Sequence, residues 1–155
     1  MHTPLKARIC HLFEAPQQRD AAARLIHDEF WTTVPGASAE GMARRLHEAS
    51  SPERVPLCLV ALHEAAVVGA INLVHSDDDN HPEWTPWLAG LVVAPSWRGQ
   101  GVGSALVLGL LAEARRLGLP RVYFGTDGPG FYTRLDAVLQ ERVHSDFCFM
   151  RFDLA

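Results

Sequence analysis

A glycine-rich segment with one arginine, "RGQGVGS" at residues 98–104, carries the clearest chemical signal in the sequence. It follows an apolar run and precedes a helical pattern, although glycine is a poor residue with which to begin a helix. The N–H groups of a helix start have no intrahelical partner, and the helix dipole adds partial positive charge there. Glycines let a phosphate group approach these N–H groups, while Arg98 adds charge and Ser104 a hydroxyl donor. The segment therefore predicts a pyrophosphate site rather than an ordinary turn, for which one glycine would suffice.

Two common nucleotide-binding patterns do not fit this segment. A P-loop ends in Gly-Lys-Ser/Thr, whereas this segment ends in Gly103-Ser104 without a lysine. The dinucleotide fingerprint G-x-G-x-x-G fails as well, because its third glycine position holds Ser104 or Leu106. A nucleotide-binding domain is therefore the weakest alternative.

The segment lies among patterns that predict alternating strands and helices in one domain, 1–155. Apolar runs predict strands at 7–15, 55–64, 66–75, 87–95, 121–126, 137–144 and 147–154. Helical spacing and stop signals predict helices from Asp20, after Ser38, from the glycine segment to about Leu117, and at 128–135. The very short connection makes 55–64 and 66–75 an antiparallel hairpin, and the helix after 87–95 makes that strand parallel to 121–126.

The glycine segment and its surroundings resemble those of the GCN5-related N-acetyltransferase (GNAT) family. "RGQGVG" (98–103) matches that family's R/Q-x-x-G-x-G/A motif, and "LVVAPSW" (91–97) resembles its fourth strand and turn. "GFYTRL" (130–135) is similar to its FYxxLGF segment. The resemblance, which extends over nearly the whole chain, implies an α/β fold with a mixed, mostly antiparallel central sheet flanked by helices. The fourth and fifth strands, here 87–94 and 121–126, are expected to splay apart.

The resemblance also implies that acetyl-coenzyme A (acetyl-CoA) is the co-substrate. Backbone amides from Gln100 to Ser104 would hold its pyrophosphate, and the fourth strand would pair with its pantetheine arm like an added strand. The expected cofactor-binding residues are Leu91, Val92, Val93, Arg98, Gly99, Gln100, Gly101, Val102, Gly103 and Ser104. No metal is expected, because the histidines and cysteines lack the spacing of metal ligands.

Acetyl transfer needs groups that move protons. By the resemblance, Tyr132 is the candidate acid for the departing thiolate, since a phenol and a thiol have pKa values near ~10 and ~8.5. Its alternative role is packing beneath the coenzyme. Glu83 is the leading candidate for the base that takes the amine proton, and His75 is the second. The N–H of Val93 is a plausible donor to the developing oxyanion.

One departure from the family pattern concerns residue 136. The family usually has glycine after "FYxxL", whereas this chain has Asp136. Aspartate is among the better residues for left-handed backbone, so the turn is expected to survive with Asp136 as a turn residue.

The segment "SDDDNHPEW" (76–84) is acidic and contains no lysine or arginine. It lies where family members bind the acceptor, and its charge would attract a cationic amine. Trp84 and Trp87 are candidates for the acceptor wall or, more commonly, for core. Phe30 and Trp31 are further candidates for the acceptor wall. Phe30 is instead expected to pack in the helix core, and the sequence leaves the role of Trp31 open.

Composition limits the partners. The net charge of −4 disfavours nucleic acid and membrane surfaces. Three widely spaced cysteines and the lack of a signal peptide pattern predict a cytoplasmic protein. The apolar final strand, "FCFMRF" (147–152), could form a homodimer contact or belong to the core.

These observations favour an N-acetyltransferase that moves acetyl from acetyl-CoA to a primary amine by direct attack, with a small cationic amine as acceptor. The alternatives are a non-catalytic acyl-CoA-binding sensor and an acetyltransferase for protein N-termini or lysines.

Overall fold

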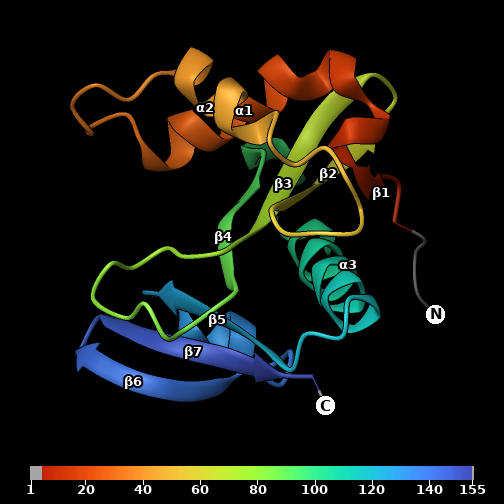
Figure 1. Cartoon of the computed structure of the whole chain (residues 1–155). Helices are drawn as coiled ribbons and strands as arrows, with labels where there is room; N and C mark the ends of the chain where they lie inside the picture. The colour runs from red at the N-terminus through yellow and green to blue at the C-terminus, as the bar shows by residue number, and fades with distance from the viewer. Residues whose placement is uncertain (1–4, 155) are drawn as a thin grey trace.

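The computed structural model describes residues 5–154, which form a seven-stranded sheet flanked by four α-helices (Figure 1). The strands are β1 (Arg8–His11), β2 (Leu57–His63), β3 (Ala66–Val74), β4 (Trp87–Val93), β5 (Arg121–Thr126), β6 (Val138–His144) and β7 (Phe147–Asp153). The α-helices are α1 (Arg19–Phe30), α2 (Ala39–Leu46), α3 (Val102–Arg116) and α4 (Pro129–Thr133). Short 3₁₀ turns lie at Leu12–Glu14, Pro16–Gln18 and Pro95–Trp97.

The sheet has the strand order β1-β2-β3-β4-β5-β7-β6. Every neighbouring pair is antiparallel except β4 and β5, which are parallel. Within the described residues, β4 and β5 pair only at Trp87 and Tyr123, and the two strands then separate. In Figure 1, β1 to β4 accordingly form one half of the sheet, and β5, β6 and β7 form the other. The predicted mixed, mostly antiparallel sheet with splayed fourth and fifth strands is confirmed.

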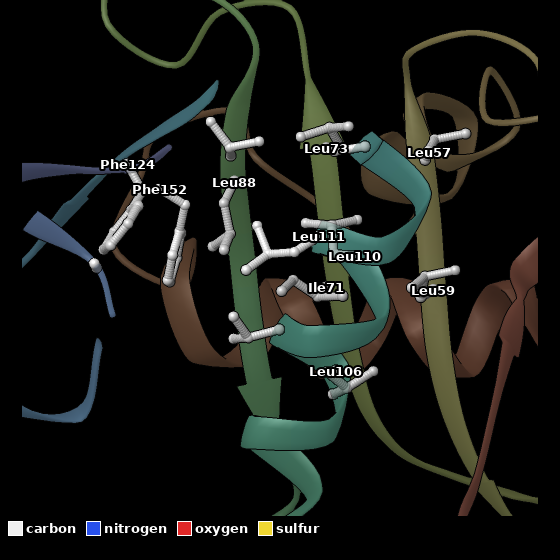
Figure 2. Close-up of a cluster of buried hydrophobic side chains, with 14 of the residues drawn as sticks. Leu57, Leu59, Ile71, Leu73, Leu88, Leu106, Leu110, Leu111, Phe124 and Phe152 are labelled. Atoms are coloured by element: carbon white, nitrogen blue, oxygen red, sulfur yellow. The ribbon is translucent and has the colours of Figure 1, made fainter. Parts of the chain in front are cut away.

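The two faces of the sheet bury different helices because side chains alternate along a strand. Leu57 and Leu59 of β2 contribute to the core beneath α3, whereas Cys58 and Val60 contribute to the core beneath α1 and α2. Figure 2 shows Leu106, Leu110 and Leu111 of α3 facing the leucines and isoleucine of β2, β3 and β4. The predicted core face of α3 is confirmed at Leu106, Leu110 and Ala114, which are fully buried, while Leu117 is half-buried against the same cluster.

Local signals explain the helix ends. Ser38 caps α2, since its Oγ accepts a hydrogen bond from the Gly41 N–H at 3.0 Å. At the C-terminal end of α3, the Gly118 N–H donates to the Arg115 carbonyl and the Leu119 N–H donates to the Ala114 carbonyl. No helix in residues 5–154 is long and apolar enough to cross a membrane.

Two predicted elements are shorter than expected. The first strand ends at His11 instead of residue 15, because the Glu14 carboxylate accepts from the His11 N–H at 3.1 Å and closes a 3₁₀ turn before Pro16. Helical spacing of Met42, Leu46 and Ala49, with a stop at Ser51-Pro52, predicts that the second helix extends past Ala49. It ends at Leu46 instead. The chain still buries Ala49, whose N–H donates to the Leu46 carbonyl at 3.1 Å in a tighter turn.

Candidate active site

The glycine segment forms the start of α3, as predicted. Gly101 is the N-cap residue with φ 90°, and Gly99 has φ 75°, so both occupy left-handed backbone that favours glycine. The N–H groups of Val102, Gly103 and Ser104 belong to the first turn, before the first intrahelical bond from Ala105 to Gly101. This helix start therefore has the amide arrangement of an anion site.

A small residue in β3 holds the start of α3 close to the sheet. A Cβ atom on Gly69 would lie 2.9 Å from Leu106 Cδ1 and 3.2 Å from the Val92 carbonyl oxygen. A larger residue here would require Leu106 or the backbone of β4 to shift, so Gly69 favours the close packing of α3 on β3 and β4. The first turn of α3 is thereby placed beside the end of β4.

The predicted pantetheine-binding residues lie on the free side of β4. Val92 and Val93 pair with Ala70 and Gly69 of β3 on one side. Because β5 pairs with β4 only at Trp87 in the described part of the chain, the other edge at Leu91 to Val93 is available for an added strand. The edge and the first turn of α3 together form an open groove of backbone donors and acceptors.

Arg98 lies at the end of this groove but faces α1. Its Nε donates to the Val93 carbonyl oxygen at 3.1 Å, and its Nη2 donates to Glu29 Oε2 at 3.3 Å. Both side chains are about half exposed, so the pair is a weak one in water. A phosphate contact from Arg98 would require the guanidinium to turn away from Glu29.

Helix α4 contacts β5 through Tyr132 and the first turn of α3 through Phe131. The Tyr132 ring lies 4.4 Å from the ring of Phe124 in β5, and Phe131 Cζ lies 3.5 Å from the Cβ position of Gly103. Burial raises the pKa of Tyr132 to about 12, and the nearby charge of Asp127 adds to the rise. The phenol therefore keeps its proton throughout the neutral range, as an acid must before it donates.

Asp136 follows α4 in left-handed backbone with φ 75°. The Asp136 N–H donates to the Thr133 carbonyl and the Ala137 N–H to the Tyr132 carbonyl, both in helix-ending geometry. The expectation that the turn survives without glycine is confirmed.

The other face of α4 borders a separate groove of about 740 Å³. It is lined by Pro129, Gly130, Thr133, Arg134 and residues of the β6–β7 hairpin, including Arg142 and Met150. None of the predicted cofactor residues lines it, so this groove is not the predicted acetyl-CoA site.

The acidic loop between β3 and β4 lies across β5 and β7. Trp84 stacks on Tyr123 of β5 with ring centroids 5.5 Å apart, and contacts Phe149 of β7 at 5.3 Å. His81 stacks on the other side of Trp84 at 3.7 Å. The loop is thus fixed by aromatic packing on the face of the C-terminal strands that α3 does not cover.

His81 is surrounded by carboxylates. Its Nδ1 lies 3.5 Å from Glu83 Oε1, and its Nε2 lies 3.5 Å from Glu141 Oε2 and 3.7 Å from Asp78 Oδ2. The candidate base Glu83 is exposed and adjoins His81. The second candidate base, His75, lies away from His81. Its Nε2 is 3.1 Å from the carbonyl oxygen of Val55, in the segment that precedes β2.

The aromatic candidates for the acceptor wall differ in how deeply they are buried. Trp87 is 1% exposed and belongs to the core, whereas Trp84 is half-buried. Phe30 is 46% exposed, so the expectation that it packs in the helix core is wrong. It is the last residue of α1. Trp31 is half-buried and carries the Arg45 guanidinium 5.9 Å above its ring.

Asp77 connects the acidic loop with α2. Partial burial raises the pKa of Asp77, while the nearby Arg45 opposes the rise. Negative charge from the loop and the aromatic residues at the end of α1 therefore lie on the same side of the sheet.

Two residues with unusual surroundings in the structure, His81 and Asn72, were not among the site residues predicted from the sequence. His81 has no second histidine or cysteine at metal-ligand spacing in the sequence, and one of its carboxylate neighbours, Glu141, is 60 positions away. Asn72 is a buried polar residue inside the apolar run of β3, and that isolation was the available signal. Within residues 5–154, no group of three His, Cys, Asp or Glu side chains could hold a metal ion.

Residues 23–136 match the model of the acetyltransferase (GNAT) family, so the chain belongs to that family and is an acyltransferase. No curated protein matches the chain significantly. The assignment agrees with the splayed sheet and the glycine-rich start of α3.

Solved structures share the fold. YncA, a putative acetyltransferase from Salmonella typhimurium solved with acetyl-CoA, has a TM-score of 0.74 at 17% identity, over 97% of this chain and 95% of that chain. An aminoglycoside 6′-N-acetyltransferase complexed with coenzyme A has a TM-score of 0.71 at 20% identity, over 96% and 97%. The N-acetyltransferase YhbS from Escherichia coli, in complex with CoA, has a TM-score of 0.70 at 23% identity, over 100% and 85%.

Proposed function

We propose that the chain transfers the acetyl group of acetyl-CoA to a primary amine by direct attack. The observation that carries the proposal is the unpaired edge of β4 beside the first turn of α3. The edge suits the amide-rich pantetheine arm, and the helix start suits the pyrophosphate. The residues proposed to bind acetyl-CoA are those expected from the sequence: Leu91, Val92, Val93 and Arg98 to Ser104.

The chain's own groups would act at three atoms. The amine nitrogen forms a bond to the acetyl carbon and gives its proton to Glu83, directly or through water. The carbonyl oxygen gains negative charge, which the Val93 N–H would stabilise. The carbon–sulfur bond breaks, and the sulfur takes the proton of Tyr132, which the fold keeps protonated.

We propose a small cationic amine as acceptor, because the loop between β3 and β4 brings several carboxylates together. Asp78, Glu83 and Glu141 surround His81, and Asp77 lies near α2. Such a concentration of negative charge attracts cations before it forms any specific contact. Two structural neighbours are aminoglycoside acetyltransferases, and aminoglycosides carry several ammonium groups.

A sensor that binds acyl-CoA without turnover is the alternative from another class. The protonated phenol of Tyr132 at the groove favours the enzyme. Acetylation of a protein N-terminus or of a lysine would use the same chemistry. The two classes of acceptor differ in size, so the space around Phe30 and Trp31 at the end of α1 would decide which class binds.

The first experiment compares thermal unfolding with acetyl-CoA, CoA, ATP and NAD. At about 100 times its dissociation constant, a ligand should stabilise the protein by about 2.7 kcal/mol. That corresponds to a rise in Tm of roughly 5–10 °C for a chain of this size. A shift with acetyl-CoA and CoA but not with NAD supports the proposal, whereas a shift with ATP or NAD alone contradicts it.

Turnover is then measured as thiol release from acetyl-CoA with a panel of primary amines, including spermidine, kanamycin and a lysine-containing peptide. Release that depends on spermidine or kanamycin supports the small cationic acceptor. Binding of acetyl-CoA without release for any amine would favour the sensor instead.

A further inference from the structure

Asn72 is the only polar residue in the buried class within residues 5–154, with 9% of its surface exposed. It lies in β3 between Ile71 and Leu73, which both belong to the core beneath α3. Because side chains alternate along a strand, Asn72 faces the side that α1 covers. Its Nδ2 and Ile26 Cγ2 of α1 lie 3.0 Å and 3.7 Å from the Cβ position of Gly90.

The amide of Asn72 has no hydrogen-bond partner. None of the side-chain hydrogen bonds among the described residues involves it, although buried polar side chains are normally paired. Among residues 5–154, His11 Nδ1 is the only fully enclosed side-chain nitrogen or oxygen without a hydrogen-bond partner. The polar atoms of Asn72 do not belong to that group. The amide therefore keeps a small area exposed to solvent.

Asn72 lies beside a bulge in β4. Ala70 pairs with Val92 and Asn72 with Ala89, so Gly90 and Leu91 together lie opposite the single residue Ile71. Gly90 has φ 63°, and a Cβ atom on it would press against the Asn72 amide at 3.0 Å. Glycine at this position leaves no side chain between the Asn72 amide and the unpaired edge of β4.

We propose that Asn72 binds the acetyl group of acetyl-CoA, with Nδ2 donating a hydrogen bond to the thioester carbonyl oxygen. This inference rests on the proposed function, in which the cofactor lies along Leu91 to Val93, and it takes the Asn72 amide instead of the Val93 N–H as the donor to that oxygen, because Asn72 lies opposite Ala89 and Val93 lies opposite Gly69. A carboxamide donor is neutral at every physiological pH. In a largely buried position, such a donor stabilises the negative charge that develops on the carbonyl oxygen during attack.

A purely structural role for Asn72 explains less. A residue that supports the bulge would hydrogen-bond to the backbone of β4, and no such bond of its side chain is present among residues 5–154. An apolar residue would fill the same space without the cost of burying an unpaired amide. The removal of the amide should therefore leave the free protein as stable as before, or more stable.

The test compares the dissociation constants of acetyl-CoA and CoA, measured by calorimetry on the wild type, N72A and N72D. In N72A the preference for acetyl-CoA over CoA should fall about 3- to 10-fold, the range expected for one neutral hydrogen bond. The affinity for CoA should stay within about 2-fold, since CoA lacks the carbonyl. In N72D the preference should fall further, because a carboxylate repels the carbonyl oxygen. N80A, in the exposed loop, is the matched control and should behave as the wild type.

The outcomes separate this inference from the proposed function. An unchanged preference in N72A, with CoA still bound, overturns the role of Asn72 and leaves the proposed function intact. If the wild type binds neither ligand, the proposed function fails and this inference fails with it. A Tm of ligand-free N72A far below that of the wild type would show that Asn72 acts structurally, which also contradicts the inference.

Discussion

At the residue scale, the fold changes the chemistry of ordinary side chains. Burial against Phe124 raises the pKa of Tyr132 to about 12, whereas a free phenol titrates near ~10. Burial also raises the pKa of Cys58 to about 12, which makes this thiol unreactive in the core. The same physical cause therefore makes the Tyr132 phenol a weaker acid than a free phenol and keeps the Cys58 thiol inert.

Replacement of Tyr132 by phenylalanine should lower kcat for thiol release by about 100-fold or more, the usual contribution of a general acid. The ring remains, so the dissociation constant of acetyl-CoA should change by less than about 2-fold. The only other tyrosine, Tyr123, stacks on Trp84, and Y123F is the control. Equal losses in both variants would indicate that Tyr132 only packs.

The stability of the protein at high pH should depend on Tyr132. Its pKa in the folded protein lies above that of the unfolded chain, so the folded state resists ionisation of the phenol. The contribution of Tyr132 is intact below about pH 10 and is lost as the pH rises toward about 12. Urea unfolding across this range should show a steeper fall in the free energy of unfolding for the wild type than for Y132F. Parallel curves would contradict the burial of the phenol.

At the element scale, the start of α3 combines a structural and a functional requirement. Gly101 has φ 90° at the N-terminus of the helix, and Gly118 has φ 75° just after its C-terminus. A Cβ atom on either glycine would meet nothing within 4 Å, so their backbone conformation alone requires glycine. The two positions are separated by the length of α3, and only Gly101 adjoins the proposed pyrophosphate site.

G101A and G118A form a matched pair. Each should lower the free energy of unfolding by about 1–2 kcal/mol through left-handed strain. Only G101A should also reduce the rise in Tm that acetyl-CoA produces, because it disturbs the amides of the first turn. Thermal unfolding with and without acetyl-CoA measures both effects, and an equal loss of ligand response in both variants would rule out a local role for Gly101.

The loop between β3 and β4 should contribute in two separable ways. E83Q removes the candidate base and should lower kcat by about 100-fold. D79N removes one exposed charge and should raise KM for spermidine by about 2- to 5-fold at low salt, with the effect lost near about 0.5 M salt. Steady-state kinetics at two salt concentrations distinguishes them, and a normal kcat in E83Q would move the role of base to water or to another residue.

At the scale of the whole molecule, the site exists because the two halves of the sheet separate. The first half carries the unpaired edge of β4, and the second half carries Tyr132 through β5 and α4. We propose that all 155 residues act as one domain, since each half supplies only part of the groove. We also propose a cytoplasmic location, on the basis of the three widely spaced cysteines. Either half alone would lose the groove.

A homodimer is proposed to form through β6 rather than through the final strand. β7 lies between β5 and β6 with Cys148, Met150 and Phe152 buried, so it belongs to the core. β6 is the edge strand and exposes Val138, Leu139 and Val143, although two register shifts disfavour direct strand pairing. L139E/V143E should be monomeric by light scattering if the wild type is dimeric. A dimer that survives both substitutions would place the contact elsewhere.

The sequence by itself predicted the elements and the candidate anion site. Apolar periodicity, together with glycine, proline and other start and stop signals, located the seven strands and four α-helices, because these patterns lie within each segment. The cluster of glycines before α3 marked the helix start that we propose binds phosphate, because the motif lies within seven consecutive residues. Errors in the bounds of these elements were confined to ends, such as the 3₁₀ turn after His11, where a single side chain decides the backbone.

Only the tertiary structure decided which distant residues meet. His81 and Glu141 come together because the β3–β4 loop packs across β5 and β7, which depends on the contact of Trp84 with Tyr123 and Phe149. Asn72 lies beside a bulge in the neighbouring strand β4, and the periodicity of the sequence does not encode such a bulge. Phe30 was predicted to lie in the core, yet it is exposed at the last position of α1. Such contacts join residues far apart in the chain, so their physical cause is the packing of whole elements rather than any local pattern.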